Sequence, residues 1–160
     1  LFESFDVTLT DTDGQGDTHY YTPDGKPMRQ AFLRAPLEFS RISSNFNMNR
    51  RHPLFNRSMP HRGIDYSAPT GTPILAAGDG RVVTASRTAP NGNYLVVQHG
   101  SQVTTKYLHL SRFGSGIKQG MRIKQGQVIG YEGNTGNSTG AHLHWMVEHN
   151  GRFVNPRLFL

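Results

Sequence analysis

The sequence predicts an all-β fold in which short, mainly antiparallel strands form a sandwich or a barrel. The first observation is a regular succession of short apolar runs, separated by turn signals. The second is the abundance of turn formers, with 18 glycines and 9 prolines among 160 residues. The third is a hydrophobic share of only 35% without sustained helical periodicity. Together they favour many strands and tight turns over a helical bundle.

The N-terminal part is expected to contain a hairpin and one short helix. Residues 1–22 alternate around a polar stretch at 11–17, a pattern typical of two strands joined by a flexible tip. A turn at 23–26 follows. A short helix near residues 26–34 would end before Pro36, because the residue that precedes a proline disfavours the helical conformation.

The chain divides into an N-terminal segment and one main domain. A length of 160 residues is enough for a single domain with a substantial core. We expect residues 39–160 to form that domain and residues 1–38 to be a separate segment, such as the end of a preceding domain. Because the first residue is Leu1 rather than Met, we expect a fragment or mature form of a longer chain.

From residue 37 onward the pattern is strand, turn, strand. Turn signals rich in glycine or asparagine lie at 78–80, 90–93, 100–101, 118–120 and 124–126. We expect strands at 64–66, 73–77, 81–85, 94–99, 103–108, 121–123, 128–131 and 140–148. Successive side chains of each strand would point to opposite faces of the sheet.

Composition and charge exclude several classes of function. The absence of cysteine rules out disulfides and thiolate zinc sites, so any metal must be held by histidine and carboxylate groups. The net charge of +6 could serve nucleic acid, an anionic lipid or an acidic cell-wall polymer, or no dedicated partner at all. Because no basic cluster or aromatic platform accompanies this charge, we expect no nucleic acid partner. No apolar run is long enough to span a bilayer.

His142 and His144 form the most informative motif of the chain. They lie in the expected strand 140–148, where alternation places both imidazoles on one face. Such a pair suits a metal, or one metal ligand beside a proton carrier. The spacing does not distinguish these roles, and a polar strand face that happens to carry two histidines is the ordinary alternative.

A second imidazole–carboxylate pair lies upstream, at His61 and Asp65. Pro60 and Gly63 argue against a helix here, and in extended structure positions 61, 63 and 65 share a face. Together with one histidine of the downstream pair they would give three protein ligands and an open fourth position, the pattern of a catalytic zinc site. A surface ion pair is the alternative.

His109 is a further candidate, at the end of the expected strand 103–108. By alternation it would share a face with Tyr107. It could carry protons or support the metal ligands, whereas a hydrogen-bonded histidine at a strand end is the structural alternative.

These motifs, in this order, resemble the lysostaphin/LytM-type zinc metallopeptidases, which are peptidoglycan endopeptidases. The resemblance extends from about Ser43 to Pro156. It is carried by His61-x-x-x-Asp65, by Tyr107-Leu-His-Leu110, and by the run Gly-Asn-Thr-Gly-Asn-Ser-Thr-Gly-Ala-His-Leu-His that ends at His144. The upstream runs 20–25 and 31–36 are similar to the MepM/ShyA-like branch of Gram-negative bacteria. The resemblance implies a LytM-like β-sheet core with an open groove above it.

The resemblance also implies the roles of the site residues. One Zn2+ ion would be held by His61, Asp65 and His144, and His109 and His142 would be catalytic histidines that do not bind the metal. An imidazole whose pKa lies near 6.5 can accept a proton from water and pass it to a leaving amine.

The implied activity is hydrolysis of amide bonds in peptidoglycan cross-links, at D-alanyl–meso-diaminopimelate if the narrower resemblance holds. The partners would be stem peptides and a regulatory N-terminal domain or adaptor protein, and the location the periplasm or cell envelope. Some LytM-type domains lack ligands and activate a cell-wall amidase; this alternative is disfavoured because every motif position is present. Many members have glutamate directly after the aromatic residue that follows the last motif histidine, where Met146 stands here.

Overall fold

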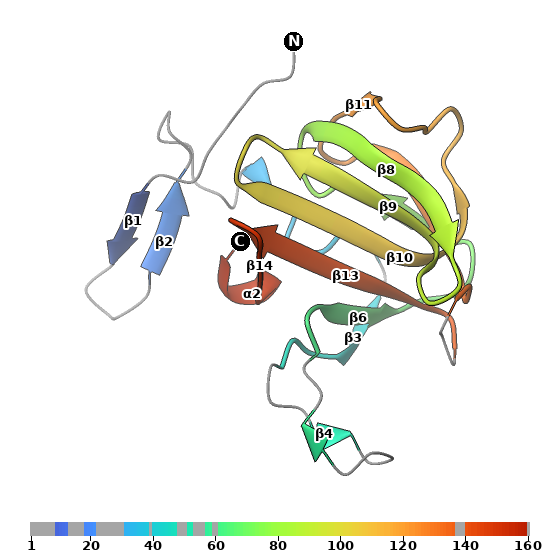
Figure 1. Cartoon of the computed structure of the whole chain (residues 1–160), viewed down its shortest axis with the longest axis horizontal. Coiled ribbons are helices and arrows are strands. Elements are labelled where there is room, and N and C mark those ends of the chain that lie inside the picture. The colour runs from blue at the N-terminus through green and yellow to red at the C-terminus, as the bar shows by residue number, and fades with distance from the viewer. Residues whose placement is uncertain are drawn as a thin grey trace.

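One large antiparallel sheet dominates the computed structural model of this chain (Figure 1). The structure describes residues 9–12, 18–21, 31–38, 40–47, 51–52, 57–58, 61–136 and 140–159. The strands are β1 (Leu9–Thr12), β2 (Thr18–Tyr21), β3 (Arg41–Ser44), β4 (Arg51–His52), β5 (Arg57–Ser58), β6 (Ile64–Ser67), β7 (Pro73–Leu75), β8 (Gly80–Thr88), β9 (Gly92–His99), β10 (Val103–Phe113), β11 (Arg122–Ile123), β12 (Val128–Glu132), β13 (His142–His149) and β14 (Arg152–Val154). A short helix, α2 (Pro156–Phe159), follows β14.

The large sheet has ten strands, and its main path runs in the order β11-β8-β9-β10-β13-β6-β3. Strand β12 pairs with β10 and β7, and β14 pairs with β13, so these strands branch from the path. Every pairing among the described strands is antiparallel. The predicted all-β fold is therefore confirmed, and the strands expected between residues 64 and 148 correspond to β6 through β13.

Strand β13 shows how alternation divides the sheet into a core face and an open face. Leu143, Trp145 and Val147 are completely buried in the core, whereas the residues between them are only half-buried. Burying each such side chain contributes about 1.5–3 kcal/mol. A slip of one residue would turn all three toward solvent, so the core fixes the register that sets His142 and His144 on the open face.

The segment before β3 packs against the same core. Phe32 is only 1% exposed. The backbone amide of Leu33 donates to the carbonyl oxygen of Ala77 at 2.7 Å, and that of Leu75 donates to the carbonyl oxygen of Pro36 at 2.6 Å. The last residue of β7 and the segment just after it are thereby tied to residues that precede β3.

The hairpin predicted within residues 1–22 is present as β1 and β2, whose antiparallel pairing begins with Leu9 opposite Tyr21. The helix predicted near residues 26–34 falls mostly on positions outside the described residues. Helix α2 was not expected from the sequence. In the part of the chain that the structure describes, no helix is long and apolar enough to cross a membrane.

His99 is buried in the core and belongs to a chain of hydrogen bonds. Its Nδ1 donates to the carbonyl oxygen of Asp79 at 2.7 Å, and its Nε2 accepts from Thr105 Oγ1 at 2.7 Å. Thr105 Oγ1 lies 2.8 Å from the Tyr107 hydroxyl, which accepts from the amide of Ala77 at 3.0 Å. Burial lowers the pKa of His99 to about 4. The imidazole is therefore neutral at physiological pH and links strands rather than carrying charge.

Glu132, at the end of β12, is a buried acidic group. Its side chain is completely buried, and neither carboxyl oxygen has a hydrogen bond of good geometry with the described residues. Burial raises the pKa of Glu132 to about 7, and the nearby amides of Ala68 and Leu143 offset only part of this effect. The group therefore takes up a proton near neutral pH, because its charged form is poorly solvated.

We expect the pH dependence of stability to differ between Glu132→Gln and the parent protein. Between the ordinary pKa of 4.5 and the folded value of about 7, the unfolded chain has lost a proton that the folded chain keeps. The parent should therefore lose up to about 3 kcal/mol of stability relative to the variant as the pH rises through this range. Urea unfolding of both metal-free proteins between pH 4 and 8 measures the difference, and a difference that stays constant with pH would contradict the burial of this carboxyl.

Candidate metal centre

The candidate metal centre is built where β6 and β13 pair. In their antiparallel register His144 lies opposite Asp65, and His142 lies opposite Ser67. Alternate residues of a strand share a face, so both histidines project from the open face of the sheet. The buried residues of β13 hold this arrangement from the other side.

Three side chains bring their donor atoms around one point. The Asp65 carboxylate lies 3.2 Å from His61 Nε2 through Oδ2 and 2.7 Å from His144 Nδ1 through Oδ1. One donor atom from each residue lies within 4.8 Å of the others. Ligands held tetrahedrally at about 2.0–2.1 Å from zinc are about 3.3 Å apart. The separation between Asp65 and His61 is close to this value, and that between Asp65 and His144 is the shorter distance of a hydrogen bond. Two imidazoles with one carboxylate are donors that zinc accepts.

His61 is oriented by backbone groups behind it. Its Nδ1 donates to the carbonyl oxygen of Asn45 at 2.6 Å. The backbones of Asn47 and His61 exchange two further hydrogen bonds, of 2.9 and 2.6 Å. Because a carbonyl oxygen only accepts, Nδ1 carries a proton, and Nε2 is the nitrogen on the side of Asp65. This is the support that a metal-binding histidine usually receives from its surroundings.

Asp65 is held in its charged form. Burial by itself would raise the pKa of its carboxyl, but hydrogen bonds and charge from His144 and His61 outweigh burial and hold that pKa well below its usual range. His142 Nε2 lies 3.9 Å from Asp65 Oδ1, compared with 2.7 Å for His144 Nδ1. The donor cluster therefore includes His144, and His142 lies beside it. The spacing of the two histidines in the sequence did not distinguish between them.

His109 reaches the open face through an irregularity in β10. The pairing of β10 with β9 shifts register between Tyr107 and Leu110, and both of these residues lie in the core. Leu108 and His109 of β10 together lie opposite a single residue of β9, which is the arrangement of a β-bulge. The backbone of His109 has a φ of 67°, in the left-handed region. The prediction that His109 shares a face with Tyr107 is therefore wrong, because the extra residue reverses the alternation.

The His109 ring is fixed next to the β13 histidines. Its Nδ1 donates to the carbonyl oxygen of Thr135 at 2.7 Å, and its backbone amide donates to that of Asn91 at 2.9 Å. The ring centroids of His109 and His142 are 5.0 Å apart, and those of His109 and His144 are 6.4 Å apart. Burial lowers the pKa of His109. Near neutral pH its Nε2 therefore has a lone pair that can accept a proton.

His142 has a matching arrangement at the start of β13. Its Nδ1 donates to the carbonyl oxygen of Gly140 at 2.9 Å, so its Nε2 is the nitrogen on the side of Asp65. The structure thus brings together every site residue that the sequence singled out: His61, Asp65, His109, His142 and His144.

Gly63 is a site residue whose role the sequence did not reveal. A Cβ atom at this position would lie 2.4 Å from the carbonyl oxygen of Trp145, 2.9 Å from Met146 Cγ and 3.1 Å from His144 Cε1. The first of these contacts is with backbone and cannot be relieved by a side-chain rotation. Glycine between His61 and Asp65 therefore lets the segment that carries these two residues approach β13 closely.

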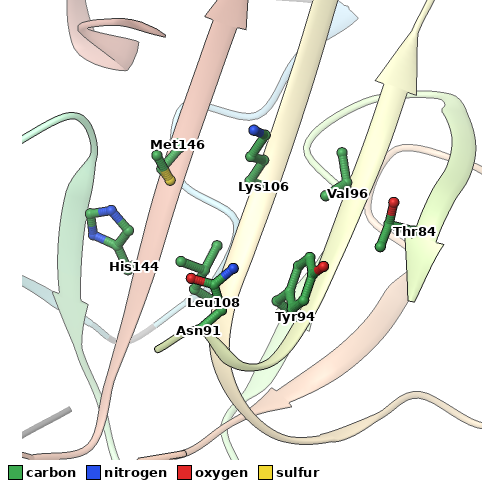
Figure 2. Close-up of a pocket in the computed structure, with 8 residues that line it drawn as sticks. All are labelled: Thr84, Asn91, Tyr94, Val96, Lys106, Leu108, His144 and Met146. Atoms are coloured by element: carbon green, nitrogen blue, oxygen red, sulfur yellow. The ribbon is translucent and has the colours of Figure 1, made fainter. Parts of the chain in front are cut away.

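A cavity of about 490 Å³ opens beside His144 on the same face of the sheet (Figure 2). Its lining residues come from the neighbouring strands β8, β9, β10 and β13 and from the loop before β9: Thr84, Asn91, Tyr94, Val96, Lys106, Leu108, His144 and Met146. This volume lies within the range of ligand pockets. A substrate segment can therefore lie across the sheet with one end next to the donor cluster.

We expect Gly63→Ala to weaken zinc binding by roughly 10–100-fold, the usual effect of disturbing groups that orient metal ligands. The added methyl group must push β13 away and move His144 from Asp65. Competition with a chromogenic chelator measures the affinity, and thermal unfolding of the metal-free variant shows whether it still folds. A folded variant with the parent's zinc affinity would contradict the close approach.

Comparison with known proteins identifies the family of this chain. The model of peptidase family M23 matches residues 59–156. The peptidoglycan DD-endopeptidase ShyC of Vibrio cholerae is 49% identical over 154 residues, which cover 96% of this chain and 34% of that protein. ShyA of the same organism is 45% identical over 140 residues, covering 87% of this chain and 32% of that protein. The chain therefore spans about a third of the length of these relatives.

Comparison with solved structures supports the same family. A zinc-containing peptidase from Vibrio cholerae superposes with a TM-score of 0.78 at 37% identity, covering 94% of this chain and 46% of that one. Lysostaphin from Staphylococcus simulans superposes with a TM-score of 0.62 at 28% identity, covering 73% of this chain and 47% of that one. The LytM-like fold and the lysostaphin/LytM resemblance are thereby confirmed. The chain belongs to peptidase family M23.

Proposed function

We propose that this chain is the catalytic domain of a zinc-dependent endopeptidase that hydrolyses peptide cross-links of peptidoglycan. The observation that carries the proposal is the donor cluster of His61, Asp65 and His144, with His109 and His142 beside it at the edge of a cavity. The family match supports the same activity. A module that only binds and activates an amidase is disfavoured, because it would not need this complete set of groups.

The proposed metal ligands are His61 through Nε2, Asp65 through its carboxylate and His144 through Nδ1. When bound, a zinc ion with three protein ligands lowers the pKa of a bound water to roughly 7 and polarises the carbonyl group of a substrate. Asp65 contributes a permanent negative charge, because its pKa is held low. The hydrogen bond from His61 Nδ1 to Asn45 keeps that ligand in its orientation.

His109 and His142 are the proposed proton carriers. Each donates its Nδ1 proton to a backbone carbonyl oxygen, of Thr135 and of Gly140 respectively, which fixes the tautomer of the neutral ring. Their Nε2 atoms are the proposed sites of proton transfer: one accepts a proton from the attacking water, and a protonated ring donates it to the leaving amine. The lowered pKa of His109 keeps this ring neutral and able to accept near neutral pH.

The proposed substrate bond is the D-alanyl–meso-diaminopimelate cross-link of stem peptides, and the proposed location is the periplasm or cell envelope. The names of ShyC and ShyA, both peptidoglycan DD-endopeptidases, support this assignment. Because the chain spans about a third of these relatives, a regulatory N-terminal domain is a compatible partner. The proposed catalytic domain comprises residues 39–160. Phe32, which precedes it, is buried in the same hydrophobic core.

Removing a metal ligand should abolish both zinc content and hydrolysis. We expect His61→Ala and His144→Ala to purify without stoichiometric zinc and to leave peptidoglycan dimers uncleaved, because two ligands do not hold the ion firmly. Elemental analysis and mass analysis of digested muropeptides, with and without chelator, provide the two readouts. Full zinc content in His144→Ala would overturn the ligand assignment.

Removing a proton carrier should separate zinc binding from hydrolysis. We expect His142→Asn and His109→Asn to keep zinc and to lose roughly 10²–10⁴-fold in rate, the usual contribution of a positioned acid or base. Asparagine suits position 109 because it tolerates the left-handed backbone better than alanine. His99→Gln, at a buried histidine outside the site, is the matched control and should keep its rate when folded. Parent-like rates in both site variants would contradict these roles.

A further inference from the structure

The cavity beside His144 is lined by one permanently charged side chain and by mostly uncharged ones. Lys106 is the one side chain of fixed charge among its lining residues, and no carboxylate lines it (Figure 2). The other residues besides His144 are either apolar (Val96, Leu108, Met146) or neutral and polar (Thr84, Asn91, Tyr94). A ligand with aliphatic parts and one negative group would match this lining.

Lys106 lies on β10, across β13 from β6 and two residues along the sheet from the pair formed by Leu108 and His144. On β10 it pairs with Met146 of β13 and with Val96 of β9, while Leu108 pairs with His144. Two residues along an antiparallel strand correspond to about 7 Å. An extended peptide advances at a similar rate, so Lys106 can reach a group within two residues of a bond held at the metal centre.

The Lys106 ammonium is held in place but has donors to spare. Its Nζ lies 2.9 Å from Glu148 Oε1 and 5.3 Å from the centre of the Phe153 ring. An ammonium has three N–H donors, so the ion pair with Glu148 leaves capacity for a second carboxylate. The side chain is 29% exposed, which shields the group partly from water and leaves it accessible to a ligand.

We infer that Lys106 is a specificity-determining residue that binds a carboxylate of the substrate. This inference rests on the proposed function. In a D-alanyl–meso-diaminopimelate cross-link, the diaminopimelate carries a carboxylate on the carbon next to the cleaved amide nitrogen. That carboxylate lies within one residue of the scissile bond, inside the reach of Lys106. Glu148 shares the Lys106 ammonium with the substrate carboxylate, and it does not line the cavity.

The test compares two synthetic muropeptide dimers that differ only in this carboxylate, which is free in one and amidated in the other. The zinc-loaded parent, Lys106→Met, Lys106→Arg and Glu148→Gln proteins are assayed for kcat and KM with each dimer. Binding of both dimers to the metal-free proteins is measured in parallel by calorimetry, so that recognition is read independently of cleavage.

We expect Lys106→Met to raise KM for the free-carboxylate dimer by roughly 10–100-fold, the usual weight of a hydrogen bond to a charged group, with kcat changed less than threefold. KM for the amidated dimer should stay within threefold of the parent value. Lys106→Arg should recover most of the loss, and Glu148→Gln should bind the free-carboxylate dimer at least as well as the parent.

A purely structural ion pair gives a different result. In that case Lys106→Met and Glu148→Gln would weaken both dimers equally, and that outcome overturns the inference. Equal calorimetric affinities of the parent for the free and amidated dimers would overturn it as well. Failure of the zinc-loaded parent to cleave either dimer would count against the proposed function instead, while the calorimetric comparison still decides the role of Lys106.

Discussion

The antiparallel pairing of β6 with β13 is the constraint on which the rest of the site depends. It sets Asp65 directly opposite His144, and it is held by the burial of Leu143 and Trp145 on the core face. A change of register by one residue would remove the histidines from the open face together. Gly63 completes the arrangement, because only a residue without Cβ lets the preceding segment approach β13 closely enough.

The second constraint is the bulge in β10. A left-handed backbone at a residue other than glycine costs about 1–3 kcal/mol, and the structure offsets this cost at His109 with hydrogen bonds to the carbonyl oxygens of Asn91 and Thr135. The bulge turns the ring toward His142. The regular strands β6 and β13 thus position Asp65 and His144, and the irregular strand β10 positions a proposed proton carrier.

Much of the fold could be predicted because alternation and turn residues are local signals. Alternation also placed His142 and His144 on one face. It failed for His109, because a bulge depends on pairing with distant strands and leaves no period-two signal in the sequence. The role of Gly63 was hidden for a similar reason: the atoms that exclude a Cβ belong to β13, far along the chain. The burial of Glu132 likewise depends on segments that only the folded sheet brings together.

We propose that two imidazoles and one carboxylate, brought together around the pairing of β6 with β13, form a single zinc site. Anomalous diffraction at the zinc edge from crystals of the zinc-loaded protein tests this claim most directly. We expect one peak about 2.0–2.1 Å from His61 Nε2, an Asp65 carboxylate oxygen and His144 Nδ1, with His142 and His109 outside the coordination sphere. A peak coordinated by His142 in place of His144, or one away from Asp65, would contradict it.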